Sequence, residues 1–167
     1  GGEPLLQMDF LTEFFKKAKA EGVHTNLDTS GNPFTDQEPW HSGWLELMKY
    51  TDLVMLDIKQ IDEQEHIKLT GHSNKNILAM ARELSDMKKP VWIRHVLVPG
   101  GSDKDEYLHR LADFIHTLSN VERVEVLPYH TLGKFKWENL GLSYPLEGVN
   151  PPTQERIDNA RKILGAI

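Results

Sequence analysis

The spacing of hydrophobic and polar positions predicts strands and helices in alternation. An unbroken apolar run at residues 53–56 is typical of a parallel strand that is covered on both faces. Further strands are expected at 23–27, 91–98 and 121–127. Apolar stripes with helical spacing predict helices over residues 9–22, 38–50, 62–69, 74–87, 103–118 and 153–164.

Local signals add detail to these elements. On the helix at 38–50, Leu45 and Met48 are expected to face the core. The segment 131–152 is long, polar and rich in glycine and proline, which predicts a surface segment without regular structure. The side chains expected to cap helices are those of Asp9, Thr153 and either Ser102 or Asp103.

The order of the elements predicts an α/β fold, in which four strands with helical crossovers form a parallel sheet. The whole chain, 1–167, is expected to be one domain and an open section of a barrel or sheet, because a closed (β/α)8 barrel needs about 250 residues. The strand at 23–28 would then have an unpaired edge carrying Val23 and Leu27. That edge predicts self-association or poor solubility.

Composition narrows the class of protein. Hydrophobic residues make up 39% and charged residues 26% of the chain, as in ordinary globular domains. The formal charge of −6 argues against general binding to nucleic acid or to an anionic membrane. No apolar run approaches the ~20 residues that span a bilayer, and no signal peptide is visible. With no cysteine present, these features favour the cytoplasm.

Polar side chains occur where successive strands are expected to end. In a parallel sheet these ends lie along one rim, where α/β proteins place their chemistry. Carboxylates there could share a cation, and basic side chains could hold an anionic or polar ligand. A surface ion pair after a buried strand remains the alternative for Asp57 and Lys59. The residues at the four ends are Asp28 and Thr29, Asp57 and Lys59, Arg94 and His95, and His130.

Three other patterns do not indicate the metal, phosphate or nucleic-acid sites that they superficially resemble. His109 and His116 share a helical face, but no carboxylate–histidine cluster surrounds them. Residues 99–102 could cradle a phosphate, but they lack the lysine and spacing of a P-loop. The basic and aromatic residues at 134–137 favour, in an acidic chain, a loop that contacts a protein or covers a site.

The first four residues, Gly-Gly-Glu-Pro, suggest that the chain is a fragment of a longer protein. Paired glycines allow a sharp strand-to-helix turn or a close approach of the backbone to a ligand, and both uses presuppose a preceding strand. Glycines left over from expression, followed by a loop, are the alternative.

These segments together resemble the pyruvate formate-lyase activating enzymes, which are glycyl-radical activases of the radical S-adenosylmethionine superfamily. The resemblance extends over essentially the whole chain, and Asp-Leu-Val-Met-Leu-Asp-Ile-Lys at 52–59 is close to a family signature. The other matching segments, in the family's order, are 1–4, 27–29, 92–94, 98–100, 127–130 and 133–134.

The resemblance implies a partial (β/α)6 barrel of the radical S-adenosylmethionine type. It implies that the backbone of Gly1, Gly2 and Glu3 meets the amino group of S-adenosylmethionine. It further implies a role for Lys59, Arg94 and His130 around the carboxylate and ribose of that cofactor. The monovalent cation beside the carboxylate would be held by Asp28, Thr29, Met55 (through its carbonyl) and Asp57.

The resemblance also implies partners and a missing part. The family's cysteine loop, which holds a [4Fe–4S] cluster, is absent, so this fragment alone is expected to be inactive. The complete activase would generate a glycyl radical on pyruvate formate-lyase, with electrons from an external donor such as flavodoxin or ferredoxin. The alternatives are an activase of another glycyl-radical enzyme, or a barrel-type binding module without chemistry.

Overall fold

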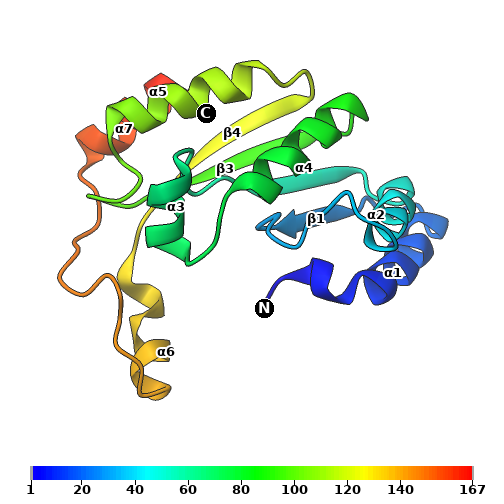
Figure 1. Cartoon of the computed structure of the whole chain (residues 1–167), viewed down its shortest axis with the longest axis horizontal. Coiled ribbons are helices and arrows are strands. Elements are labelled where there is room, and N and C mark those ends of the chain that lie inside the picture. The colour runs from blue at the N-terminus through cyan, green and yellow to red at the C-terminus, as the bar shows by residue number, and fades with distance from the viewer. Residues whose placement is uncertain (1, 167) are drawn as a thin grey trace.

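A four-stranded parallel sheet forms the centre of the computed structural model, which describes residues 2–166 (Figure 1). The strand order follows the chain, and every neighbouring pair is parallel. This confirms the predicted α/β fold with an open sheet whose edges are its first and last strands. The strands are β1 (Asn26–Thr29), β2 (Leu53–Asp57), β3 (Val91–Leu97) and β4 (Val121–Pro128).

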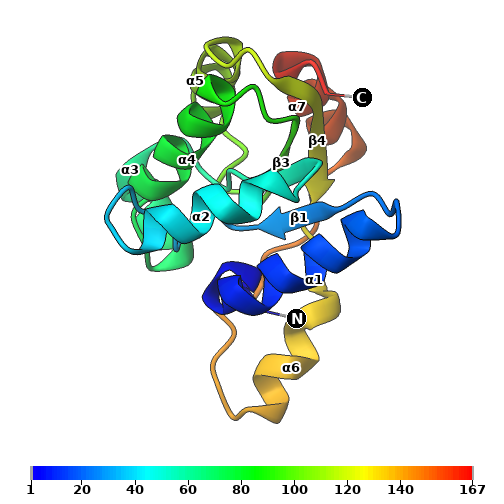
Figure 2. The ribbon, with the colours of Figure 1, turned by 90° about the vertical axis from the view of Figure 1, so that its right-hand side faces the viewer.

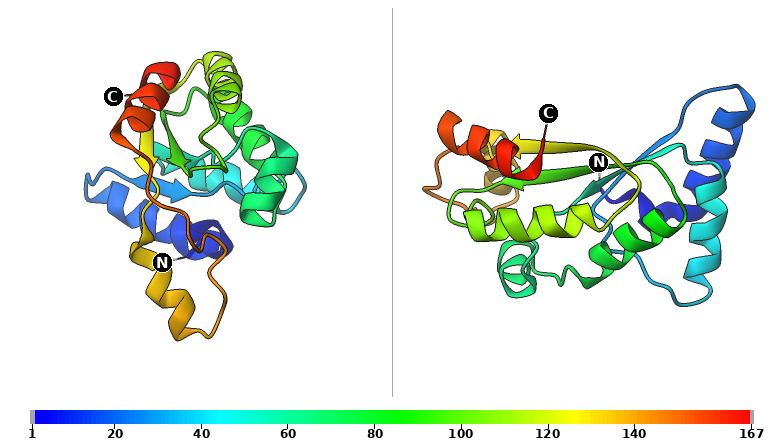
Figure 3. Two further views of the ribbon diagram at one scale, coloured as in Figure 1. Left: turned by 90° about the vertical axis from the view of Figure 1, so that its left-hand side faces the viewer. Right: turned by 90° about the horizontal axis from the view of Figure 1, so that it is seen from above.

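Helices connect the strands and cover mainly one face of the sheet, along which α4 and α5 lie (Figure 3). A short 3-10 helix, η1 (Pro4–Gln7), leads into the first α-helix, and another, η2 (Thr131–Gly133), precedes the sixth. None of the helices within residues 2–166 has the length and apolar character needed to cross a bilayer. The α-helices are α1 (Met8–Ala20), α2 (Trp40–Lys49), α3 (Glu63–Thr70), α4 (Lys75–Asp86), α5 (Asp105–His116), α6 (Lys134–Asn139) and α7 (Gln154–Leu164).

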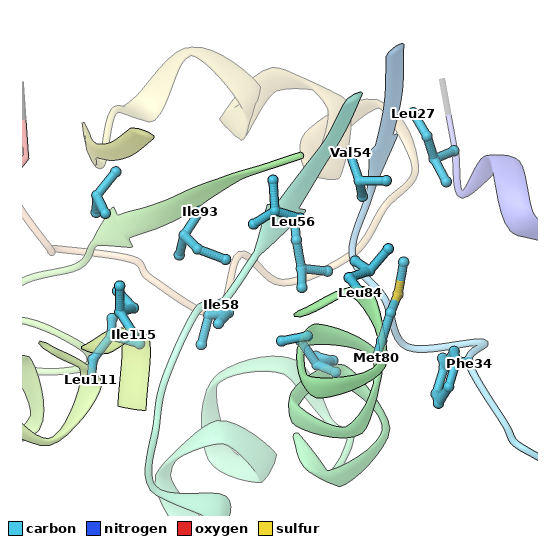
Figure 4. Packing of buried hydrophobic residues seen from close by; sticks show 14 of the residues in the cluster. Leu27, Phe34, Val54, Leu56, Ile58, Met80, Leu84, Ile93, Leu111 and Ile115 are labelled. Atoms are coloured by element: carbon cyan, nitrogen blue, oxygen red, sulfur yellow. The ribbon is translucent and has the colours of Figure 1, made fainter. Parts of the chain in front are cut away.

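The core lies between the sheet and these helices. Leu56 and Ile93, from the two central strands, face Leu84 of α4 and Leu111 of α5, and all four are fully or almost fully buried (Figure 4). Alternate strand residues point the other way, and Met55 is only half-buried. The prediction that both faces of β2 are covered is therefore wrong for residues 2–166, because Met55 and Asp57, on the face opposite Leu56, remain partly exposed.

The first strand begins later than predicted, at Asn26 instead of residue 23. Val23 lies in the turn that follows α1, where its N–H donates to the carbonyl of Ala18 at 2.9 Å. Leu27 is buried, and Val23 is exposed but lies outside the strand, so the apolar edge predicted from these two residues does not form. The outer side of β1 is nevertheless unpaired within residues 2–166.

Helix caps were predicted with mixed success. Thr153 caps α7 by accepting from the N–H of Arg156, as expected. Asp9 is no cap, because η1 runs directly into α1 and places Asp9 in its first turn. Neither Ser102 nor Asp103 caps α5. Their side chains bind the end of β3 and the loop after it instead: the Ser102 hydroxyl donates to the carbonyl of Val96 at 2.6 Å, and Asp103 accepts from the N–H of Gly100 at 2.8 Å.

Two further predictions are corrected at the surface. The segment 131–152 contains η2 and α6, which project away from the sheet in two perpendicular views (Figure 1 and Figure 2). Leu45 is exposed, whereas Met48 is buried as predicted. The buried face of α2 is offset from the predicted one because Trp44 and Leu47 occupy it.

Asp52 ties the helix–strand connections together at the amino ends of β1 and β2. One carboxylate oxygen accepts from Lys19 Nζ at 2.7 Å, and the other accepts from the N–H of Thr25 at 2.8 Å. The Lys19 hydrogen bond, reinforced by Thr25, lowers the pKa of Asp52 from 3.8 to about 2.

We therefore expect Asp52→Asn to make folding less sensitive to acid. Because the folded-state pKa is depressed, the carboxylate's contribution is fully present above pH 3.8 and is lost as the pH falls through about 2. Urea unfolding of wild type and variant at several pH values between 6 and 2 should show a stability difference that shrinks in this window. A difference independent of pH would contradict the assignment.

Candidate functional site

Glu3 fastens the amino-terminal segment to the carboxyl end of β1. Its Oε1 accepts from the Thr29 hydroxyl at 2.6 Å, and its Oε2 accepts from the hydroxyl of Ser30 at 2.6 Å and from the N–H of Ser30 at 2.9 Å. Gly2 has a φ of 92°, a left-handed conformation that glycine adopts without strain. Residues 2–3 and the carboxyl end of β1 are thus held together.

Acidic and basic side chains from three strands meet on the open face of the sheet. Asp57 and Arg94 are direct neighbours in the β2–β3 register. Arg94 Nε donates to Asp57 Oδ1 at 2.9 Å, and Lys59 Nζ donates to Asp57 Oδ2 at 2.6 Å. A terminal nitrogen of Arg94 also donates to Asp28 Oδ1, which lies on β1. The network therefore crosses from β3 over β2 to the edge strand.

Burial distinguishes the two carboxylates. The side chains of Asp57 and Arg94 are 17% and 16% exposed, whereas that of Asp28 is 54% exposed. Burial by itself would lower the pKa of the Arg94 guanidinium, but the carboxylates of Asp57 and Asp28 outweigh this effect and raise the pKa. Arg94 is therefore a fixed cation, held mainly by Asp57.

A hollow of about 660 Å³ lies beside these groups. Its size is within the ~300–1,000 Å³ range of small-molecule sites. The charged residues that line it are the three carboxylates of Glu3, Asp28 and Asp57, whereas Lys59 and Arg94 pair with these carboxylates from outside the lining. The hollow therefore favours a ligand with a net positive charge. Its lining residues are Gly2–Pro4, Leu11, Phe15, Asn26–Ser30 and Asp57.

Some predicted site residues lie apart from this network. The side chain of Thr29 is buried on the opposite face from Asp28 and is bound to Glu3. Within the described part of the chain, the His130 side chain makes no hydrogen bond or ion pair, although it follows β4 at the same edge of the sheet. Met55 lies next to Asp28 in the strand register. Gly1 falls outside the described residues.

Arg94 and His95 do not end their strand as predicted, because β3 continues to Leu97. Their side chains point to opposite faces. His95 is buried, and its Nδ1 lies 2.9 Å from the carbonyl oxygen of Ile58. Burial lowers its pKa. His95 therefore supports the loop after β2 from behind, whereas Arg94 faces the open side.

Sequence reasoning missed Ser30. It binds Glu3 through both its hydroxyl and its N–H. Its position directly after Asp28 and Thr29, at a predicted strand end, was the only indication that Ser30 belongs to the site. Glu3 lies 27 positions away in the sequence, and a contact over that separation leaves no local pattern.

The chain is similar to several known proteins. Residues 1–114 match the radical SAM superfamily. The chain is 56% identical over 164 residues to the pyruvate formate-lyase-activating enzyme of Streptococcus mutans and 58% identical to that of Staphylococcus epidermidis, in each case over 98% of this chain. A crystal structure of a domain of pyruvate-formate lyase-activating enzyme from Bacteroides vulgatus superposes with a TM-score of 0.78 at 25% identity, over 99% of this chain and 89% of that one.

The relatives are longer than the chain that matches them. The match spans 62% of the Streptococcus mutans protein and 65% of the Staphylococcus epidermidis protein. Parts of these relatives therefore have no counterpart among the 167 residues.

Proposed function

We propose a function from the premise that this chain belongs to the radical SAM superfamily: it forms part of an activating enzyme that uses S-adenosylmethionine and a [4Fe–4S] cluster to generate a glycyl radical on pyruvate formate-lyase. The observation that carries the proposal is the charge network of Asp57, Lys59 and Arg94 beside the hollow that Glu3 closes. Residues 1–167 would act as one domain of a cytoplasmic enzyme.

The hollow suits S-adenosylmethionine by charge. The cofactor carries a sulfonium, an ammonium and a carboxylate, so its net charge of +1 complements the carboxylates that line the hollow. The backbone of Gly1, Gly2 and Glu3 would meet the ammonium, and Lys59 and Arg94 would meet the carboxylate. His130, whose side chain makes no hydrogen bond or ion pair within residues 2–166, would reach the ribose.

A monovalent cation at Asp28, Thr29, Met55 and Asp57 fits less well. Both carboxylates already accept from Arg94, and the Thr29 hydroxyl already donates to Glu3. Binding a cation there would require Arg94 to withdraw, after which two carboxylates, a hydroxyl and the carbonyl of Met55 would offer the hard oxygen ligands that such ions prefer.

The cluster does not fit residues of this chain, because the sequence contains no cysteine to supply thiolates. Its ligands would come from another segment of the complete enzyme, and an external donor such as flavodoxin or ferredoxin would supply the electron. S-adenosylmethionine bound with a reduced cluster would supply the one-electron chemistry of hydrogen-atom abstraction. The part of this chain is to orient the cofactor: Glu3 fixes the segment at its amino end, and Asp57 aims Lys59 and Arg94 at its carboxylate.

The projecting segment favours a macromolecular partner. Phe135 and Leu140 of this segment are exposed, as is Leu132, and together they form apolar surface beyond the carboxyl end of β4. The same surface would serve if the partner were another glycyl-radical enzyme, or if this chain were a binding module without chemistry. The unpaired side of β1 would also permit self-association of the isolated chain.

The proposal is tested by electron paramagnetic resonance. The complete enzyme with reduced cluster, S-adenosylmethionine and pyruvate formate-lyase should yield a glycyl-radical signal, whereas the 167-residue chain alone should yield none. Parallel incubations with other glycyl-radical enzymes identify the partner. A reconstituted complete enzyme that leaves S-adenosylmethionine intact would overturn the proposal.

A further inference from the structure

Lys59 lies where the support of the sheet ends. β2 has ended before it, although the N–H of Ile58 still donates to the carbonyl of its neighbour on β3 at 2.9 Å. Residues 58–60 then continue without regular structure. Ile58 and Gln60 are completely buried, whereas the side chain of Lys59 between them is 34% exposed. The direction of the Lys59 side chain therefore depends on what holds its two neighbours.

Buried polar side chains hold both neighbours from the covered side of the sheet. Nδ1 of His95, on β3, lies 2.9 Å from the carbonyl oxygen of Ile58, which belongs to the peptide bond that leads into Lys59. On the other side, Gln60 Nε2 donates to the carbonyl of Gly101 at 3.0 Å. His95 and Gln60 are 2% and 0% exposed, so neither side chain reaches a ligand. They can affect ligand binding only through the segment that they hold.

The surroundings of the His95 ring determine which hydrogen bond it makes. Its Nε2 lies 3.2 Å from the carbonyl oxygen of Ser102, so both ring nitrogens face groups that can only accept. Burial lowers the pKa of His95, which keeps the ring neutral with a single proton. That proton belongs on Nδ1, because the carbonyl of Ile58 is the closer of the two. The ring therefore donates to the peptide before Lys59, and its contact with Ser102 is not a hydrogen bond.

We propose that His95 is a positioning residue for S-adenosylmethionine, whose hydrogen bond to Ile58 aims Lys59 at the carboxylate of the cofactor. The inference rests on the proposed function, which gives Lys59 that contact. Lys59 lines a hollow of about 230 Å³ that shares Ser30 and Asp57 with the larger hollow, so its side chain lies next to the proposed cofactor site. A small rotation of the peptide before Lys59 would move its ammonium group away, because a long side chain magnifies a change at its base.

The test measures the affinity of the complete enzyme for S-adenosylmethionine by isothermal titration calorimetry. The amide nitrogen of asparagine takes about the place of histidine Nδ1, and that of glutamine takes about the place of Nε2. His95→Asn therefore keeps the donor to Ile58 and should bind within about twofold of wild type. His95→Gln turns its donor towards Ser102 and should bind about tenfold more weakly, because the contact between ammonium and carboxylate is weakened.

Asn120→Ala is the matched control for loss of a buried hydrogen bond. Asn120 is also buried, and its Nδ2 donates to a loop carbonyl, that of Lys89, at 2.6 Å. This contact lies at the amino end of β4, at the opposite end of the sheet from the proposed cofactor site. The variant should therefore lose stability and keep its affinity for S-adenosylmethionine.

A double-mutant cycle separates positioning from general damage. If His95 acts through Lys59, the loss caused by His95→Gln should disappear in a Lys59→Met background, where no ammonium remains to be aimed. The same loss in both backgrounds overturns the positioning role, as do equal affinities of His95→Asn and His95→Gln, or an equal loss in Asn120→Ala. A wild-type complete enzyme that does not bind S-adenosylmethionine overturns the proposed function itself, and the positioning role with it.

Should His95→Gln fail to fold, the wild-type complete enzyme labelled with ¹⁵N-histidine decides. Nuclear magnetic resonance must show the proton of His95 on Nδ1, where it can be donated to Ile58. A proton on Nε2 overturns the positioning role, because Nδ1 would then have nothing to donate.

Discussion

In the activating enzyme proposed above, replacing Asp57 with asparagine is expected to reduce glycyl-radical formation about a hundredfold. Asp57 is the acceptor shared by Lys59 and Arg94, and it is largely buried with Arg94. Removing one member of such a pair leaves the remaining charges partly desolvated and misdirected, at a cost of about 2–3 kcal/mol. The measurement is the rate at which the radical signal appears, with S-adenosylmethionine affinity measured in parallel.

Asp28→Asn is the matched control for this prediction. Asp28 accepts from the same guanidinium, but its side chain is 54% exposed, so water screens its charge. We expect its loss to cost less than about 1 kcal/mol. Equal effects of the two variants would mean that the carboxylates act together on a ligand, as in a cation site, and not through Arg94.

Gly31→Ala is expected to destabilise folding by about 3 kcal/mol. Gly31 turns the chain immediately after the first strand end with a φ of 70°, which costs any other residue about 1–2 kcal/mol. A Cβ there would also lie 2.8 Å from Leu56 Cδ1 and 3.2 Å from the sulfur of Met80, both in the packed core. Overpacking of this kind adds about 1–3 kcal/mol. Thermal unfolding should show a midpoint lowered by about 10 °C.

The control for this substitution is Gly100→Ala. Gly100 has a φ of 75°, but no atom lies within 4 Å of the position of its Cβ. This variant therefore experiences only the backbone cost, about 1 kcal/mol, and should melt about 3 °C below wild type. If both variants lose the same stability, the close approach to Leu56 contributes nothing.

The strands and helices with strong hydrophobic patterns were predictable. The observed ends of β2, β3 and β4 lie within about one residue of the predicted ends, because short apolar runs of this length are typical of buried strands. The start of β1 was not predictable. The β-branched residues Val23 and Thr25 favour a strand by themselves, but a helix-ending hydrogen bond and the contact with Asp52 hold them outside the sheet.

The site was predictable only in part, for a similar reason. Asp57, Lys59 and Asp28 follow from their positions at strand ends, and Arg94 joins them through register. The hydrogen bonds of Glu3 with Thr29 and Ser30 depend on contacts between distant segments. No local pattern records them.

Arg94 reaches from β3 across β2 to the edge strand, and this has a mechanical consequence. On its outer side β1 has no hydrogen-bonded neighbour within residues 2–166. The ion pair between Arg94 and Asp28 therefore helps to hold this edge strand to the rest of the sheet. An exposed ion pair of this kind weakens as ionic strength rises, because the screening length at 0.15 M salt is already about 8 Å. The mobility of β1 therefore depends partly on the salt concentration, whereas the hydrogen-bonded inner strands depend on it much less.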